Sequence, residues 1–162
     1  MVLKMRRRSG CPVSISLERF GDRWSLLIIR DLMVRGYTTF KQFKESGEGI
    51  ATNVLTARLK RLVAEGLVET ERDARDGRRL HYRLTEKGIA LAPVMLELLL
   101  WASRYEETAA PCELMEQMAA HREHVLVEVT RRWKERDPEP FLRPFKEKVK
   151  SGRREKKRSG CG

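Results

Sequence analysis

Apolar side chains recur at the spacing of short helices along the first 66 residues of the chain. A first helix is predicted to begin at Pro12, after Cys11 at the N-cap. The backbone N–H of the first helical residue has no acceptor within the helix, so proline, which lacks this N–H, is favoured there. It would end near Phe20, and Asp22 would cap a second helix over residues 23–34. The apolar positions expected to supply the core of the second helix are Trp24, Leu27, Ile28 and Leu32.

The next two predicted helices are joined by a turn that is rich in glycine, at residues 46–49. Thr39 and Gln42 fit a capping box that opens a brief helix, and a longer helix is expected over residues 51–65 with Gly66 as its C-cap. Its inward stripe consists of Leu55, Leu59 and Leu62, and its outer face of Thr52, Asn53, Thr56, Lys60 and Arg61. Such a pair is typical of a helix-turn-helix, whose second helix enters the DNA major groove.

After Gly66 the pattern changes to that of β-strands, which are predicted over residues 67–72 and 80–84. Asp76-Gly77 between them suits a hairpin turn that needs positive φ. The arginines that crowd this connection are Arg72, Arg75, Arg78 and Arg79. A basic hairpin directly after a helix-turn-helix is interpreted as a wing that contacts phosphates or the minor groove, and the alternative is a solubilising loop tip.

The helix predicted over residues 85–106 is apolar nearly all round between Val94 and Ala102, and Pro93 would kink or start it. A helix of this kind is covered on more than one side, either by a large internal core or by a partner subunit. The domain is small, so we expect a partner. The expected dimer-interface residues are Leu96, Leu99, Leu100 and Trp101. A second helix, after a break near Pro111, is expected to pack beside the first.

These patterns divide the chain into four predicted regions. They are a basic N-terminal arm at 1–10, a winged helix-turn-helix at 11–88, a helical dimerisation region at 89–135 and a basic, disordered tail at 136–162. The predicted fold class is mainly α with a small β-hairpin wing: a winged helix-turn-helix with long C-terminal dimerisation helices.

Charge and composition narrow the class of partner. The chain has 34 Lys and Arg against 23 Asp and Glu, a net charge of +11, which favours a polyanion or, alternatively, is an ordinary solvated surface. No uninterrupted apolar run reaches the roughly 18 residues of a membrane span, and no signal peptide is recognised. The 3 cysteines are an odd count, unlike a secreted disulfide framework. We therefore expect a cytoplasmic protein that binds no membrane.

Sequence motifs of enzymes are missing from this chain. It has no phosphate-binding glycine loop, no nucleophile elbow and no paired carboxylates in an evident pocket, so we expect neither catalysis nor a cofactor. Cys112, His121 and His124 fall short of a metal ligand set, because no acidic residue or second thiol completes them. No metal site is therefore expected.

Several short motifs occur in a fixed order along the chain. They are Cys11-Pro12, Gly21-Asp22-Arg23-Trp24, residues 26–32, Phe40-x-x-Phe43, Gly49-Ile50, Val54-Leu55-x-x-Arg58-Leu59-x-x-Leu62, Gly66-Leu67-Val68 and Tyr82-Arg83-Leu84-Thr85-x-x-Gly88. Together they resemble the HxlR-type branch of bacterial winged-helix regulators, related to the MarR type, over about residues 11–105. The resemblance implies a homodimer with paired terminal helices, which represses or activates at a palindromic operator.

The chain departs from the family pattern at two places. Ala51 stands where the family usually has Ser or Thr, which leaves Gly49 or Thr52 to cap the helix. The segment after about residue 110 extends beyond the usual family length. Its role is therefore not carried over from the resemblance.

The expected function is a transcription regulator, a repressor, that binds double-stranded DNA as a homodimer. Thr52, Asn53 and Thr56 are candidates for base contacts, because Asn pairs with adenine and Thr meets the thymine methyl. Candidates for phosphate contacts are Thr39, Lys41, Lys60 and Arg78. The other predicted DNA-binding residues are Arg61 on the outer face of the helix and Arg75 and Arg79 in the wing, which would meet phosphates or the minor groove. The alternative function is a non-specific nucleic-acid-binding or architectural protein driven by the basic arms, which would bind all duplexes with a steep salt dependence.

Cys11 is a candidate sensor of oxidants or electrophiles. A thiol at a helix N-terminus near residues 6–8, all arginine, favours its reactive thiolate form. The resemblance supports this, since the equivalent cysteine is a sensor in some members of the family. The alternative is a small structural cysteine at a helix start.

Overall fold

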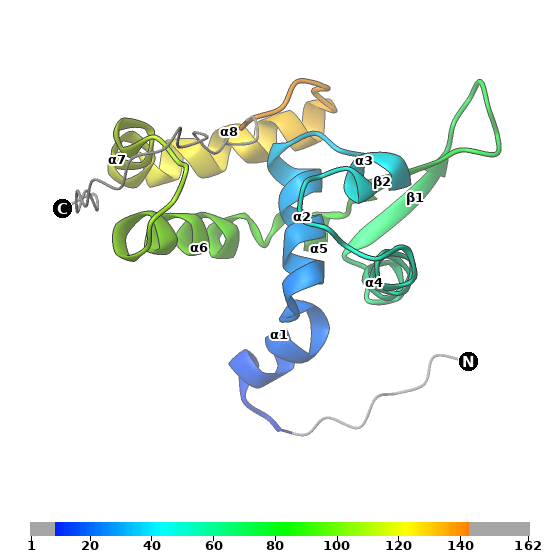
Figure 1. Cartoon of the computed structure of the whole chain (residues 1–162), viewed down its shortest axis with the longest axis horizontal. Helices are drawn as coiled ribbons and strands as arrows, with labels where there is room; N and C mark the ends of the chain where they lie inside the picture. Colours follow the sequence, from blue (N-terminus) through cyan, green and yellow to red (C-terminus); the bar gives the residue numbers. More distant parts are fainter. Residues whose placement is uncertain (1–8, 143–162) are drawn as a thin grey trace, which may run out of the picture. The chain divides into compact units, whose positions relative to one another are not determined.

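The computed structural model describes residues 9–142. Within these residues, helices dominate and a single two-stranded antiparallel hairpin accompanies them, which confirms the predicted fold class (Figure 1). The chain forms two compact units, one from residues up to 32 together with 37–88, the other from 33–36 together with 89 onwards. Most of the predicted basic arm and most of the predicted tail lie outside the described residues.

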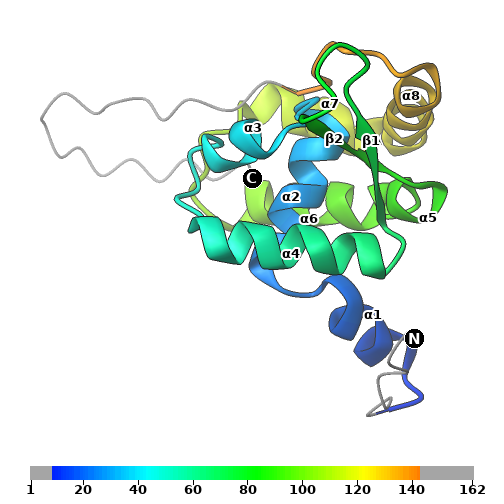
Figure 2. The same cartoon turned by 90° about the vertical axis from the view of Figure 1, so that its right-hand side faces the viewer.

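The first unit contains the elements predicted for a winged helix-turn-helix. They are α1 Pro12–Phe20, α2 Arg23–Val34, α3 Phe40–Lys44, α4 Thr52–Ala64, β1 Val68–Arg72 and β2 Leu80–Leu84. Figure 2 shows α4 along its length, with α3 and the hairpin beside it. The connection between α3 and α4 uses Gly47 and Gly49 at positive φ, which L-residues with side chains rarely adopt.

Local caps fix the ends of the short helices in the first unit. Asp22 accepts a hydrogen bond from the Ser25 N–H at 3.1 Å, and Thr39 with Gln42 forms the predicted capping box. At the end of α4 the C-cap is Glu65, and Gly66, which the sequence predicted as the C-cap, follows it with a φ of +68°, in the left-handed conformation that often ends a helix. The N-cap of α4 is Ala51, which makes no side-chain capping bond, so the predicted replacement by Gly49 or Thr52 is wrong.

The core of the first unit lies under α4. Leu55, Leu59 and Leu62 are each at most 2% exposed, so the predicted inward stripe of the helix is buried. Burial of a side chain of this size stabilises the fold by about 1.5–3 kcal/mol. Gly88 lies so close to the backbone just before β1 that a Cβ there would stand 2.1 Å from the Leu67 carbonyl oxygen. The chain therefore needs glycine where it leaves the hairpin.

The hairpin pairs β1 with β2 in antiparallel register, and Glu71 lies opposite His81. The predicted turn of positive φ at Asp76-Gly77 is wrong, because Gly77 is not among the residues with positive φ. The connection is instead a longer loop, in which the Asp73 carboxylate accepts the N–H groups of Arg75 at 2.7 Å and Asp76 at 3.0 Å. A side chain, rather than a left-handed backbone, shapes this loop.

The second unit is built from three helices after a short turn of helix, α5 Glu86–Ile89. These helices are α6 Ala92–Tyr105, α7 Cys112–Ala120 and α8 Arg122–Glu135, and α6 packs against both of the others. Each of the two long helices predicted here is thus divided, the first between α5 and α6, whose second residue is Pro93, and the second at His121. The core includes Leu96, Leu100, Met115, Met118, Val125 and Val129.

The segment after α8 belongs to the second unit. Arg136 ends α8 with a φ of 54°, and the Leu142 N–H donates to the Val34 carbonyl oxygen at 2.8 Å. The guanidinium of Arg132 lies 5.7 Å from the centroid of the Phe141 ring. Residues 136–142 are thus part of the packed unit, whereas the sequence assigned them to a disordered tail.

By length and composition alone, the run Glu86–Tyr105 is apolar enough to cross a membrane, with a mean hydropathy of 1.2 over its best window. The core helix of a soluble protein passes the same test, and 33% of this window is buried inside the protein. The run is also divided between α5 and α6. Its composition is therefore weak evidence for a membrane location.

Candidate nucleic-acid interface

The outer face of α4 is polar and open to solvent. Thr52, Asn53 and Lys60 are exposed, as the sequence predicts for a helix that reads DNA. Thr56 is half-buried, and its hydroxyl donates to the Thr52 carbonyl oxygen at 2.9 Å, which leaves its methyl group for an apolar contact. Ala57 is also exposed on this helix, and sequence reasoning missed it because alanine carries no polar signal. Its small side chain lets the helix approach another surface closely.

Arg61 belongs to a different contact from the one predicted. Its guanidinium donates to the Glu18 carbonyl oxygen of α1, so it does not lie free on the outer face of α4. Two further links join the same part of the fold. Arg19 Nη1 donates to both carboxylate oxygens of Glu65, just after α4, and Arg58 forms an ion pair at 2.9 Å with the Asp22 carboxylate, just after α1. We call these three links the α1–α4 clamp.

The charge on Asp22 is stabilised within this clamp. Burial alone would raise its pKa, but hydrogen bonds from Ser25 and the nearby positive charges of Arg58 and Arg61 outweigh that effect, so the pKa lies below its usual value. Asp22 is therefore ionised at neutral pH and can hold the Arg58 guanidinium.

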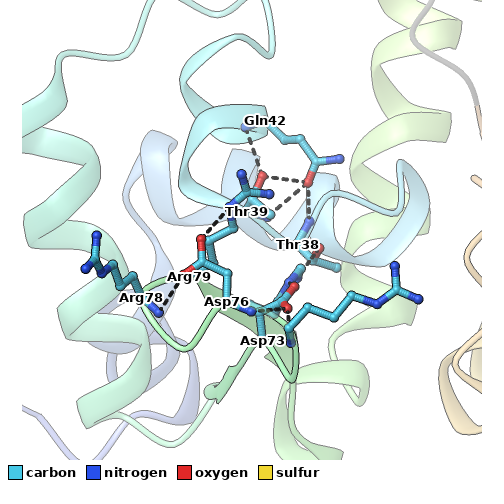
Figure 3. Close-up of polar contacts among 9 residues, drawn as sticks. Thr38, Thr39, Gln42, Asp73, Asp76, Arg78 and Arg79 are labelled. Atoms are coloured by element: carbon cyan, nitrogen blue, oxygen red, sulfur yellow. Dashed lines mark hydrogen bonds and ion pairs between the residues drawn. The ribbon is translucent and has the colours of Figure 1, made fainter.

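The side chains at the start of α3 differ in their availability. The Thr39 hydroxyl accepts the Gln42 N–H and donates to the Gln42 Oε1 at 2.9 Å, so its proton is engaged in the cap (Figure 3). Lys41 is exposed and lies 4.0 Å from the Glu45 carboxylate, a surface pair of small energy. Lys41 is thus the better candidate for a phosphate contact.

The wing arginines fall into two groups. Arg79 pairs with the Asp76 carboxylate at 3.3 Å, and Arg72 donates to the Gly77 carbonyl oxygen at 3.1 Å. Arg75 and Arg78 give only their backbone N–H groups to neighbouring carboxylates, and their guanidinium groups form no ion pair within residues 9–142. Figure 3 shows the Arg78 side chain extending away from the loop. These two are the wing side chains available to a phosphate.

Asp73 organises the wing loop as an ionised carboxylate. A hydrogen bond from His81, followed by the backbone N–H groups of Asp76 and Arg75, lowers its pKa to about 2. The acidic residues of the wing thus turn their charge toward the loop's own N–H groups.

Cys11 is exposed and has a free thiol, at the N-cap of α1. Its N–H donates to the Ser9 hydroxyl at 3.0 Å, and its side chain makes no capping bond. The arginines at 6–8 lie outside the described residues. Cys112, by contrast, is disulfide-bonded, and no cluster of three candidate metal ligands occurs within residues 9–142.

An exposed apolar stripe runs along α6. It consists of Val94, Leu98, Trp101 and Tyr105, which are 42%, 46%, 57% and 63% exposed, and we call it the α6 stripe. Of the predicted interface residues, Trp101 lies on this stripe, Leu99 is half-buried, and Leu96 and Leu100 are buried. The last two are covered by their own chain, which sequence periodicity could not foresee without the paths of α7 and α8.

Helix α1 also carries apolar side chains that its own unit leaves uncovered. Val13 and Leu17, one turn apart, are 66% and 59% exposed. No residue of α1 is buried, although apolar side chains occur along the helix. Exposed apolar faces of this kind mark sites of association.

Comparisons with known proteins agree on one family. The sequence profile of the HxlR-like helix-turn-helix family matches residues 19–110. YdeP of Bacillus subtilis (strain 168), an uncharacterised HTH-type transcriptional regulator, is 30% identical over 98 residues, which are 60% of this chain and 76% of YdeP.

Two solved structures are similar to the same part of the chain. PA1607, a candidate transcription factor, has a TM-score of 0.58 and 38% identity, over 63% of this chain and 70% of its own. The redox regulator HypR in its oxidised form has a TM-score of 0.55 and 28% identity, over 60% of this chain and 100% of its own. Helices α7 and α8 follow the matched residues 19–110.

Proposed function

The chain belongs to the HxlR-like helix-turn-helix family of transcription regulators, and from this premise we propose that it represses transcription by binding a palindromic operator as a homodimer. The observation that carries the proposal is the exposed polar face of α4 beside a wing with two available arginines. Recognition helices read bases from the major groove, while arginines on a wing neutralise phosphates. The proposed partner is thus double-stranded DNA. The proposed location is the cytoplasm, where this DNA lies.

Asn53 is the residue that we assign to base reading. It is exposed in the first turn of α4, where a recognition helix reaches base edges, and its amide suits the paired donor and acceptor of adenine. Lys60 lies two turns further along and forms no hydrogen bond or ion pair within residues 9–142. Its charge suits a phosphate.

The second subunit of the proposed dimer covers the exposed apolar faces. The α6 stripe supplies two aromatic rings whose centroids lie 5.5 Å apart, and aromatic side chains are enriched where proteins associate. Val13 and Leu17 supply a second apolar surface. A two-fold dimer would present two α4 helices about 34 Å apart, one turn of DNA.

Fluorescence anisotropy on the DNA upstream of the protein's own gene, and on a scrambled duplex, tests the proposal. Asn53→Ala is expected to weaken binding to the operator by about 10- to 100-fold and to leave binding to the scrambled duplex unchanged, because a base contact carries about 1–3 kcal/mol. Lys60→Ala should weaken both equally and lower the salt slope by about 1.

The matched control is Lys134→Ala, which removes an exposed lysine from the last turn of α8 and should change neither measurement. Equal binding of the wild-type protein to both duplexes, with a steep salt dependence, would contradict the proposal. That result would favour the non-specific, architectural binder.

We further propose that Cys11 makes DNA binding responsive to oxidants. Its thiol is free and exposed at the start of a helix that is joined to α4 by the α1–α4 clamp, and the similar protein HypR is a redox regulator. Hydrogen peroxide would oxidise the Cys11 thiol to a sulfenic acid: one peroxide oxygen is transferred to the sulfur, the O–O bond breaks, and one water is released.

The oxidant response is measured in the same anisotropy assay. Peroxide is expected to change operator affinity at least about tenfold in the wild-type protein, dithiothreitol to restore it, and Cys11→Ser to remove the response. An identical response in Cys11→Ser would show that Cys11 is not the sensor and would leave the regulator itself untouched.

A further inference from the structure

Three segments of the first unit meet at His81 on β2. The imidazole Nε2 lies 2.9 Å from the Asp73 Oδ2 in the wing loop, and Nδ1 lies 3.1 Å from the Thr38 hydroxyl oxygen, just before α3. The backbone repeats this link, since the Tyr82 N–H donates to the Thr38 carbonyl oxygen at 2.7 Å. His81 also forms a β-bridge with Thr39. One side chain therefore connects the wing to the start of the helix-turn-helix.

The partners of the ring fix the position of its proton. Asp73 is ionised and can only accept, so Nε2 carries the hydrogen and donates it to the carboxylate. In the neutral ring, Nδ1 then accepts from the Thr38 hydroxyl.

The link continues from His81 to the available wing arginines. The second oxygen of Asp73 accepts the Arg75 N–H at 2.7 Å and the Asp76 N–H at 3.0 Å. Asp76 in turn accepts the Arg78 N–H at 3.1 Å. Figure 3 shows Asp73, Asp76 and Arg78 of this series, with the loop beside Thr38, Thr39 and Gln42. A continuous series of hydrogen bonds thus runs from Thr38 to the backbone of both arginines.

We propose that His81 is a positioning residue for DNA binding, which holds Arg75 and Arg78 at a fixed distance from α3 and α4. The inference rests on the proposed function and assigns it a residue that does not touch DNA. Without the imidazole, the loop would keep its internal turn around Asp73, but it would lose its side-chain attachment to Thr38. The two arginines would then lose more conformational entropy when they bind phosphates, and the free energy of DNA binding would be less favourable.

His81 is suited to a test of positioning, because its loss should leave the fold intact. Its side chain is 36% exposed and that of Asp73 is 27% exposed, and ion pairs at the surface contribute little to stability. The readout is therefore DNA affinity and its salt slope, measured on variants with unchanged urea unfolding midpoints.

The experiment is a double-mutant cycle between His81→Ala and Arg78→Ala on the full-length protein. Arg78→Ala alone should weaken binding about tenfold and lower the salt slope by about 1, since one phosphate contact is lost. His81→Ala should produce a similar loss of affinity and slope. In the His81→Ala background, Arg78→Ala should cost less than about twofold, because the arginine is no longer held in place.

Two further variants make the cycle decisive. His81→Gln keeps one donor and one acceptor and should recover most of the affinity, whereas His124→Ala removes an exposed histidine of α8 and should change nothing. Additive losses in the cycle, or a loss in His81→Ala that is matched by a lowered unfolding midpoint, would overturn the proposal.

The failure of this inference can be distinguished from failure of the proposed function. Phosphate contacts carry no sequence information, so the cycle is also measured on the scrambled duplex. Coupling there would establish the role of His81 even if no operator were preferred. A preference for the operator without coupling between His81→Ala and Arg78→Ala would contradict the positioning role of His81 and leave the proposed function intact.

Discussion

Replacement of Trp101 by glutamate is expected to split the homodimer and to weaken binding to a two-half-site operator by about 10²- to 10⁴-fold, the gain that joining two binding sites provides. Trp101 is 57% exposed at the centre of the α6 stripe, so a carboxylate there remains solvated in the separate protomer. In the dimer it would be buried without a partner, which costs far more.

Light scattering after size exclusion measures the mass, and anisotropy measures the affinity for DNA. The matched control is Val127→Glu, because Val127 is 66% exposed on α8 and lies outside the α6 stripe. An unchanged dimer mass in Trp101→Glu, with unchanged urea unfolding, would move the subunit interface elsewhere, and the faces of α1 would be examined next.

Phe43→Ala is expected to destabilise the first unit by about 3–5 kcal/mol, because a buried ring is replaced by a cavity. Phe43 is 1% exposed, and its ring meets the Tyr82 ring edge-on with centroids 5.9 Å apart. It thus joins the short helix α3 to the hairpin. Ile28 and Leu55 line the same small pocket, so the loss would also loosen α4.

Equilibrium unfolding in urea measures this cost, and operator affinity should fall with the folded fraction. Phe43→Leu keeps most of the apolar volume and should cost about 1.5 kcal/mol or less. A cost below about 1 kcal/mol for Phe43→Ala would show that the neighbouring side chains collapse into the space, and that the ring does not hold α3 in place.

Local signals explain why much of the first unit is predictable from sequence. Pro12 at a helix start, the capping box of Thr39 and Gln42, and the left-handed Gly66 just after α4 each act within a few residues along the chain. The leucines of α4 recur at the spacing of a helix and fall on one face, so the sequence alone identifies the buried side of this helix. These features required no knowledge of the rest of the chain, and the structure reproduces them.

The contacts of individual charged side chains were not predictable in the same way. Arg61 and Lys60 are adjacent and equally basic, yet only Arg61 meets the Glu18 carbonyl oxygen, and that depends on where α1 lies. The wing loop likewise depends on the Asp73 side chain, which overrides the turn preference of Asp76-Gly77. Such choices are made by residues distant in sequence.

The burial of α6 shows the same limit on a larger scale. Because α6 is apolar nearly all round, its sequence does not show which face is buried by the same chain. Leu96, Leu99, Leu100 and Trp101 were therefore equivalent candidates for the dimer interface. Only the packing of α7 and α8 separates the buried leucines from the exposed tryptophan. The helices that decide this lie after residue 110, where the family resemblance ends.

The α1–α4 clamp has a geometric consequence for the proposed dimer. The links made by Arg61, Arg58 and Arg19 tie α4 and the residue that follows it to α1 and the turn that follows it, so we expect the two helices to move as one rigid body. If α1 packs against α1 of the partner subunit, the crossing angle between these two helices also sets the angle between the two α4 helices. The contact between the two α1 helices would then determine the distance between the two α4 helices. The number of base pairs between half-sites would therefore depend on α1 rather than on the surfaces that touch DNA.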